Sequence, residues 1–194
     1  MTSSLIAREP SSARIKRFLE RYRTHEAVDM NNVDYNDIEA ILYEYFQRID
    51  EMFFFKLLTR EIQGVSKPRK LVAIKTHEVP DANILGLFDQ NHDRIEIWLN
   101  RLRTFETYPL EHFICVLAHE MVHAYIGIFA DERHDMHDEW VNDHCGHGTM
   151  FWKLLGYILD RLFELTGSER VWEQICEEES ARRAFSRKPR CFLT

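Results

Sequence analysis

Apolar side chains recur at helical spacing through the first quarter of the chain. The first stripe follows two serines and consists of Ile15, Phe18, Leu19 and Tyr22. This i, i+3, i+4, i+7 pattern predicts a helix over residues 12–23 with a serine at its N-cap. A longer stripe follows Asp34 and Asn36, either of which can cap it, and predicts a second helix that ends before Gly64.

The hydrophobic period changes after residue 70. Short β-rich runs occupy residues 71–74, 84–88 and 95–99, and the last two flank a stretch at 89–93 with the composition of a hairpin loop. We expect three strands in one small sheet. Its simplest arrangement is antiparallel, and a mixed sheet is the alternative.

A third helix is expected from Pro109 to about Phe129, because proline suits the first helical turn. Between residues 113 and 128 nearly every side chain is hydrophobic or small, as in a helix that is buried on most sides. The exceptions are His119, Glu120 and His123.

The C-terminal part of the chain alternates between loop and helix patterns. Residues 131–148 are polar, acidic and rich in histidine, so they are expected to form a loop. Thr149 is the expected cap of a fourth, amphipathic helix that stops at Gly167. Ser168 is the expected cap of a fifth helix, which extends to about Phe185.

Length and composition are those of one globular unit. The 194 residues, 45% hydrophobic and 29% charged, predict a single α+β domain over 1–194 in which helices pack on the small sheet. Four scattered cysteines without a CxxC pair favour reduced thiols over disulfides or a cysteine zinc ribbon. Apolar runs are too short for a membrane span or a secretory signal, so we expect a soluble intracellular protein with no membrane partner.

The net charge of −7 is unevenly distributed. Residues 1–23 carry six basic and two acidic side chains and residues 180–194 carry five basic and no acidic ones, so the body between them has a net charge of −16. A third basic cluster consists of Lys67, Arg69, Lys70 and Lys75. DNA would therefore bind weakly, through the basic ends and this cluster, because the body repels a polyanion. The simpler interpretation is that the basic ends are solvated.

The sequence HEMVH at 119–123 is an HExxH pattern on the buried third helix. At about 100° per residue, His119 and His123 lie roughly 40° apart around the helix axis, so both imidazoles can reach one metal ion. Glu120 projects beside them. A buried glutamate that served no metal-bound water would cost several kcal/mol in desolvation or would have to stay protonated. The core face is separate and consists of Phe113, Leu117, Met121, Ala124 and Ile128.

A third ligand is needed, because catalytic zinc usually takes three protein ligands and a water molecule. Metzincin spacing is excluded, since the chain has Ile126 and Phe129 where that motif needs glycine and histidine. A downstream glutamate of the gluzincin type would be Glu139, which stands in an acidic loop. The other candidates are the loop histidines His134, His137, His144 and His147.

His147 is the best placed of these histidines. Gly146 and Gly148 flank it, and the capped fourth helix follows directly and can hold it rigidly. A second metal site is the alternative use of the remaining loop residues, although a solvated loop is the favoured interpretation. These residues are His134, His137 and His144 with Asp135 and Asp138.

Three segments together resemble the SprT-like (Spartan-type) zinc metalloprotease family. They are IEIWLN at 95–100, HEMVHAY at 119–125 and HGTMF at 147–151. The resemblance covers about residues 36–165 and implies a zincin-like fold with Zn²⁺ held by His119, His123 and His147 and with Glu120 as the catalytic residue.

The same resemblance implies proteolysis of proteins crosslinked to DNA, and with it a nuclear location. The 24 residues from His123 to His147 exceed the compact spacing of the family. The loop at 129–145 therefore looks like an insertion over the site.

The expected reaction is zinc-assisted hydrolysis of a protein or peptide. Glu120 would take the proton of the attacking water and pass it to the leaving amine. An extended peptide is expected along an edge strand near 93–99, and Tyr125 or a loop histidine is the candidate for stabilising the oxyanion. Two alternatives stay open: a zincin-fold hydrolase whose substrate is unrelated to DNA, and a binding module with a structural metal. Glu120 disfavours the second, since a structural site has no use for it.

Overall fold

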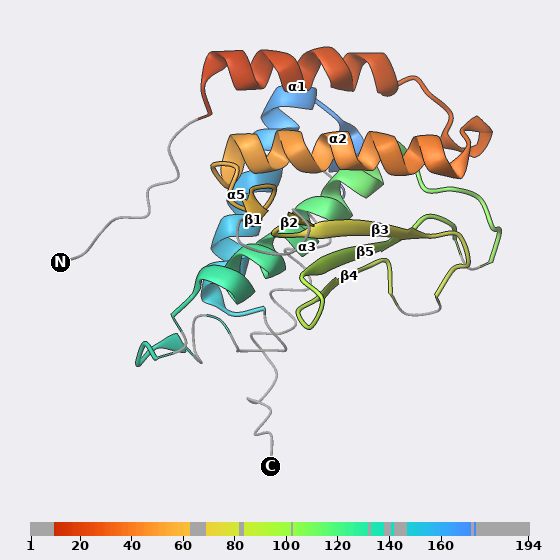
Figure 1. Ribbon diagram of the computed structural model, residues 1–194. Coiled ribbons are helices and arrows are strands. Elements are labelled where there is room, and N and C mark those ends of the chain that lie inside the picture. Colours follow the sequence, from red (N-terminus) through yellow and green to blue (C-terminus); the bar gives the residue numbers. More distant parts are fainter. Residues whose placement is uncertain are drawn as a thin grey trace.

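The computed structural model describes residues 10–62, 69–81, 84–101, 103–131, 133–137, 141, 147–171 and 173. In these ranges the chain has an α+β architecture, with helices packed around a small mixed sheet (Figure 1). Buried apolar side chains from helices and strands form a continuous core.

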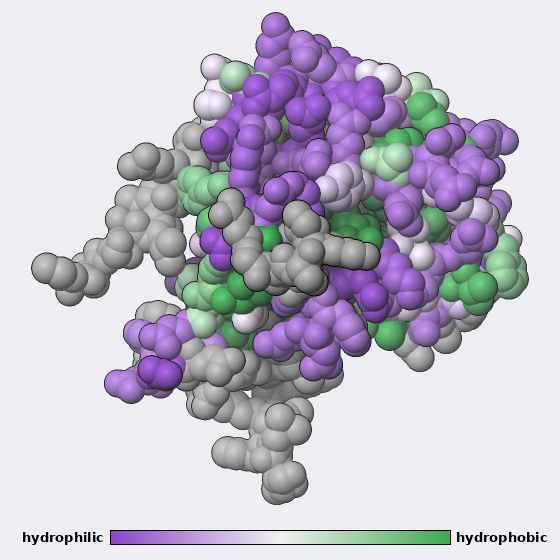
Figure 2. All heavy atoms as spheres, viewed as in Figure 1, coloured by the Kyte–Doolittle hydropathy of each residue, from purple (hydrophilic) through white to green (hydrophobic). Residues whose placement is uncertain are grey.

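Two N-terminal helices form the outer layer of the fold. Helix α1 (Ser12–His25) packs on α2 (Tyr35–Phe53), which in turn contacts α3 and β3 (Figure 1). The short 3-10 helix η1 (Met30–Asn32) lies between them in the chain. The Asp34 side chain caps α2 by accepting the Asn36 N–H at 2.9 Å, one of the two predicted caps. The space-filling view shows a largely hydrophilic surface over these helices (Figure 2).

The three-stranded sheet has the order β3-β5-β4. Strands β4 (Gly86–Asp89) and β5 (Arg94–Trp98) form the predicted antiparallel hairpin. Strand β3 (Ala73–His77) pairs with β5 in parallel, so the mixed alternative is confirmed and a fully antiparallel sheet is wrong. The parallel register places Ile74 beside Ile95, which continues the apolar inner face across both strands.

A second, two-stranded sheet was not predicted. Strands β1 (Glu61–Ile62) and β2 (Arg69–Lys70) pair antiparallel. Two residues per strand are too few to produce an alternating pattern, which explains why the sequence carries no signal for them.

The central helix α3 (Leu110–Phe129) has Pro109 as its N-cap, so it begins one residue after the predicted start and ends at the predicted Phe129. Its predicted core face is buried at four positions, and Ile128 is half-buried. By length and apolar composition α3 could cross a membrane, but core helices pass the same test, and more than half of its most apolar window is buried inside the protein. The buried positions of that face are Phe113, Leu117, Met121 and Ala124.

Helix α5 (Thr149–Thr166) packs against α3. Its N-cap is Gly148, one residue before the predicted Thr149, and it ends as predicted at Gly167, which has a φ of +64°. Residues 169–171 and 173 are helical, in line with a fifth helix, whose predicted remainder to Phe185 lies outside the described residues. Cys115 is a buried thiol, and the other three cysteines also lie outside the described residues.

Candidate metal centre

Three imidazole rings converge at the junction of α3 and α5. The Nε2 atom of His147 lies 3.2 Å from Nε2 of His119 and 3.2 Å from Nε2 of His123. The three ring nitrogens all lie within 4.8 Å of one another, as the ligands of one metal ion require. Two histidines come from adjacent turns of α3, and the third immediately precedes α5, as predicted.

The spacing of these nitrogens fits a small metal ion. Two Zn–N bonds of roughly 2.0–2.1 Å at a tetrahedral angle hold their nitrogens about 3.3 Å apart. Hydrogen bonding among the rings explains the arrangement less well, because the single Nε2 atom of His147 cannot donate to one neighbour and accept from the other. The three-imidazole donor set and its two separations of 3.2 Å therefore fit a metal ion that takes these three ligands and one more.

A protonated imidazole cannot bind a metal ion, and His123 resists protonation. Burial, together with the nearby His119 and His147 rings, lowers the pKa of His123 to about 3. His123 is therefore neutral at physiological pH, which is the form that ligates metals.

Phe151 supports all three rings. Its side chain is fully buried on the first turn of α5, and its ring centroid lies 4.4–4.8 Å from those of His119, His123 and His147. Sequence reasoning placed Phe151 only on the apolar face of a helix. Its place in the segment HGTMF, directly after His147 and at the start of the predicted fourth helix, was the available signal.

Glu120 lies beside the histidines, and its side chain is directed at strand β4. Only 6% of the residue is exposed. A Cβ built on Gly86 would lie 2.8 Å from both Cγ and Oε1 of Glu120, so the carboxylate packs on the strand backbone at this glycine. The separation of Glu120 from the core face is confirmed. The role of Gly86 was missed, because an isolated glycine in a strand does not reveal what approaches it.

A cleft of about 400 Å³ contains the four predicted site residues. Strand β4 forms one wall, while α3 and His147 form the other. Val141 also lines it, so one residue of the loop at 129–145 reaches the site. The complete set of lining residues is Gly86, Leu87, Phe88, Gln90, His119, Glu120, His123, Ile126, Gly127, Val141 and His147.

The strand beside this cleft is β4, which corrects the expectation of an edge strand near 93–99. Strand β5 occupies that range and is the middle strand, flanked by β3 and β4. The Trp98 N–H donates to the Leu85 carbonyl at 3.0 Å, so these opposed residues are a hydrogen-bonded pair. Because such pairs alternate along antiparallel strands, the N–H and C=O groups of Gly86 and Phe88 point away from β5, toward the free edge.

The other predicted site residues are not brought into the cleft. Tyr125 packs between Phe54 and Phe129, with centroid distances of 5.2 and 5.3 Å, and does not line it. His134 and His137 bond to the local backbone of their own loop. The described residues give no support for a second metal site there. The remaining candidates, Asp138, Glu139 and His144, lie outside the described residues.

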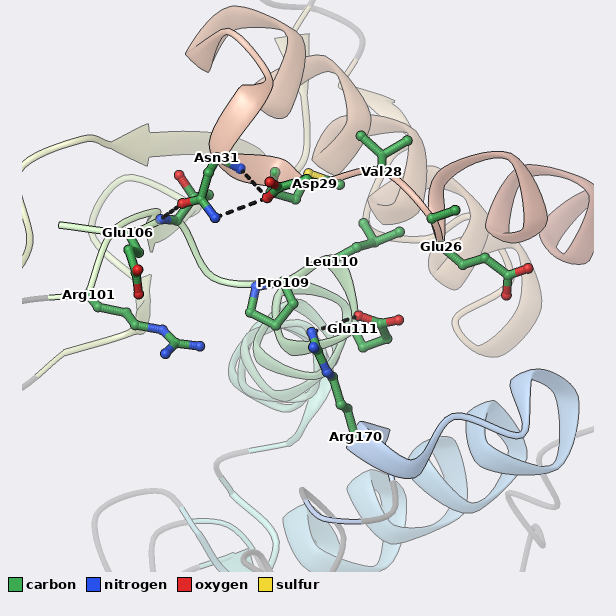
Figure 3. Close-up of a pocket in the computed structure, with 13 residues that line it drawn as sticks. Glu26, Val28, Asp29, Asn31, Arg101, Glu106, Pro109, Leu110, Glu111 and Arg170 are labelled. Carbon is green, nitrogen blue, oxygen red and sulfur yellow. Dashed lines mark hydrogen bonds and ion pairs between the residues drawn. The ribbon is translucent and has the colours of Figure 1, made fainter. Parts of the chain in front are cut away.

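A larger cavity, of about 500 Å³, lies at the N-terminal end of α3 and contains none of the predicted site residues (Figure 3). Several polar groups that line it form ion pairs or hydrogen bonds with one another. Arg170 lies 3.7 Å from Glu111, and the Asn31 N–H donates to Asp29 at 3.1 Å. Both acidic and basic side chains line this cavity, and among the described residues it holds no group of side chains placed to bind a metal ion. The smaller cleft is therefore the better candidate for a functional site.

Comparison of the chain with models of protein families, with curated proteins and with solved structures found no match. The candidate site is therefore defined by its own geometry: three converging imidazoles that can hold a metal ion, and one buried carboxylate beside them.

Proposed function

We propose that this protein is a zinc-dependent endopeptidase with a zincin-like, SprT-type fold. One observation carries the proposal: three histidine ring nitrogens converge within 4.8 Å of one another beside the buried Glu120 carboxylate, in a cleft bounded by a free strand edge. Zinc is preferred because the donor set is three neutral imidazoles, although imidazole also suits other transition metals.

Zinc bound there would acidify a water molecule and polarise the scissile carbonyl. Glu120 has the place of the general base in this scheme. Its carboxylate accepts the proton of the attacking water and then delivers it to the leaving amine.

The free edge of β4 is suited to hold the substrate. An extended peptide can pair with the N–H and C=O groups of Gly86 and Phe88, as peptides do in strand addition. Main-chain pairing of this kind depends little on side chains, so we expect broad sequence tolerance. Leu87, with 43% of its surface exposed, supplies an apolar contact beside the same edge.

The substitution Glu120→Gln tests the reaction directly. The amide is nearly isosteric but cannot accept the proton, so metal content should stay near one per chain while casein cleavage falls by at least about 100-fold. Cleavage assays and metal analysis on the same preparation give the result. Undiminished turnover by the metal-loaded variant would remove Glu120 from the proposal and point to a different reaction.

Two substrate classes remain within the proposal. The family resemblance favours proteins crosslinked to DNA, whereas the charge distribution favours a substrate unrelated to DNA. In α1, Arg17 donates to Glu51 at 2.8 Å and Arg21 to Glu44 at 2.7 Å, so these guanidinium groups already face carboxylates. Lys75 on β3 is exposed, while Lys67 and the basic tail at 180–194 lie outside the described residues.

Binding of single-stranded DNA distinguishes the two classes. If DNA is a partner, affinity should fall steeply with salt, because each neutralised phosphate releases counterions. Replacing Lys70 and Lys75 with Gln and removing residues 180–194 should then weaken both DNA binding and DNA-stimulated cleavage. Casein cleavage without any DNA binding at low salt supports the substrate unrelated to DNA.

A further inference from the structure

We infer that Gly86 is a positioning residue for Glu120: the absence of a side chain at this point of β4 sets the place of the carboxylate. The inference rests on the proposed function for its effect on turnover, but its structural part stands independently. Gly86 has no side chain, so its effect on the carboxylate comes from how closely Glu120 can pack against its α-carbon.

The contact is closer than a residue with a Cβ could make unless a neighbour shifted. A Cβ at position 86 would lie 2.7 Å from Cγ1 of Val116 and 2.8 Å from Cγ and Oε1 of Glu120. Contacts below 3.0 Å force a neighbour to move. Val116 and Glu120 are four residues apart on α3 and therefore share the helix face that meets β4.

Of these two neighbours, Glu120 is the one that can yield. A valine in a helix has one strongly preferred χ1 rotamer, so its Cγ1 is nearly fixed by the backbone. The glutamate side chain has more rotatable bonds and ends in the cleft. A methyl group at position 86 therefore displaces the Glu120 side chain, whereas its contact with Val116 is relieved only by a small shift of β4 relative to α3.

The same glycine also lies where the substrate is proposed to pair. Its N–H and C=O point to the free edge of β4, while its α-carbon faces Glu120. One residue thus fixes both the substrate main chain and the carboxylate, and so sets the distance between them. This predicts that an added methyl group reduces kcat more than it raises KM, because the carboxylate acts on the water rather than on substrate binding.

The test is Gly86→Ala in the full-length, metal-loaded protein. We expect about one metal per chain, as in the parent, and a kcat for casein-derived peptides lower by roughly 100-fold, the cost of a misplacement near 1 Å. The matched control is Gly156→Ala on α5, where a Cβ would meet nothing within 4 Å. The control should retain the parent kcat and KM.

A second measurement does not depend on turnover. Thermal unfolding of the parent, Gly86→Ala, Glu120→Ala and the double variant forms a cycle. If the added methyl group acts on Glu120, Gly86→Ala should lower Tm less in the Glu120→Ala background, where Cγ is absent. An equal loss of Tm in both backgrounds overturns the inference.

The variant Gly86→Ala/Val116→Ala separates misplacement from general damage. Removing Cγ1 of Val116 relieves the other close contact, so Tm should recover while kcat stays low. It also provides a folded protein if Gly86→Ala alone does not fold. A kcat within twofold of the parent in either metal-loaded variant contradicts the inference, whereas a parent protein without peptidase activity contradicts the proposed function and leaves the unfolding cycle as the test of Gly86.

Discussion

The Nε2 atoms of His123 and His147 lie 3.2 Å apart, although the two residues are 24 positions apart in the chain. One histidine belongs to α3 and the other directly precedes α5, and the ring of Phe151 packs against both. A metal ion at this point would therefore join the two central helices. Metal binding and the packing of α5 on α3 should consequently stabilise each other.

Replacing His147 with Ala should remove most of the bound metal. Two imidazoles would remain, and we expect affinity to fall by more than about 100-fold, since even loss of a supporting outer-sphere group costs 10–100-fold. Competition with a chromophoric chelator measures the change. His134→Ala is the matched control, because His134 is exposed and lies outside the cleft. Metal loss in the control with retention in His147→Ala would mean that the third ligand is assigned wrongly.

The ion pairs between α1 and α2 should make stability depend on pH. Burial alone would raise the pKa of Glu44, but hydrogen bonds from Arg21 and Arg48 outweigh it and hold this pKa below its ordinary value. The folded-state pKa is therefore lower than the unfolded one. The stabilisation is present above about pH 4.3, the ordinary glutamate pKa, and is lost as pH falls through the folded-state value.

Glu44→Gln should remove this part of the acid sensitivity. At neutral pH and low salt the variant should lose about 1 kcal/mol or less of unfolding free energy, because both partners are partly exposed. The difference from the parent should shrink on acidification and in high salt. Urea unfolding at several pH values measures it, and a difference that grows toward acid pH would contradict the assigned ion pair.

Asp50 should be important for the turn that follows α2. Its fully buried carboxylate accepts the N–H groups of Leu58 and Thr59 and the Thr59 hydroxyl, at 2.6–3.2 Å. Asp50→Ala should cost roughly 3 kcal/mol or more, since each buried donor left unsatisfied costs about 1–3 kcal/mol. Glu51→Ala, on the next position of the same helix, is the control and should cost less. Equal losses of unfolding free energy would show that the buried hydrogen bonds contribute little.

Sequence patterns located the helices well because each signal is local. Asp34 caps α2, Pro109 precedes α3 and Gly167 ends α5, and each acts on its own turn of backbone. The three histidines of the candidate metal centre were equally predictable, since the i, i+4 pair lies on one helix and His147 is next to another.

The parts that escaped prediction depend on pairings between distant segments. Whether β3 runs parallel to β5 is decided by the path of the chain around β4, which no local pattern records. For the same reason the sequence does not reveal that β4, rather than the strand near 93–99, lies at the edge of the sheet. The contact of Gly86 with Glu120 joins residues 34 positions apart, so neither residue alone reveals it.

An open strand edge next to a hydrophobic core is also a hazard, because it can pair with another chain and begin aggregation. Three features of β4 limit that risk. The strand has only four residues, it begins with glycine, a poor strand former, and it ends at the charged Asp89. Its edge also lines a cleft opposite α3 rather than lying on an open face. We therefore expect the recess to admit a single flexible peptide more readily than the flat edge of a second folded copy.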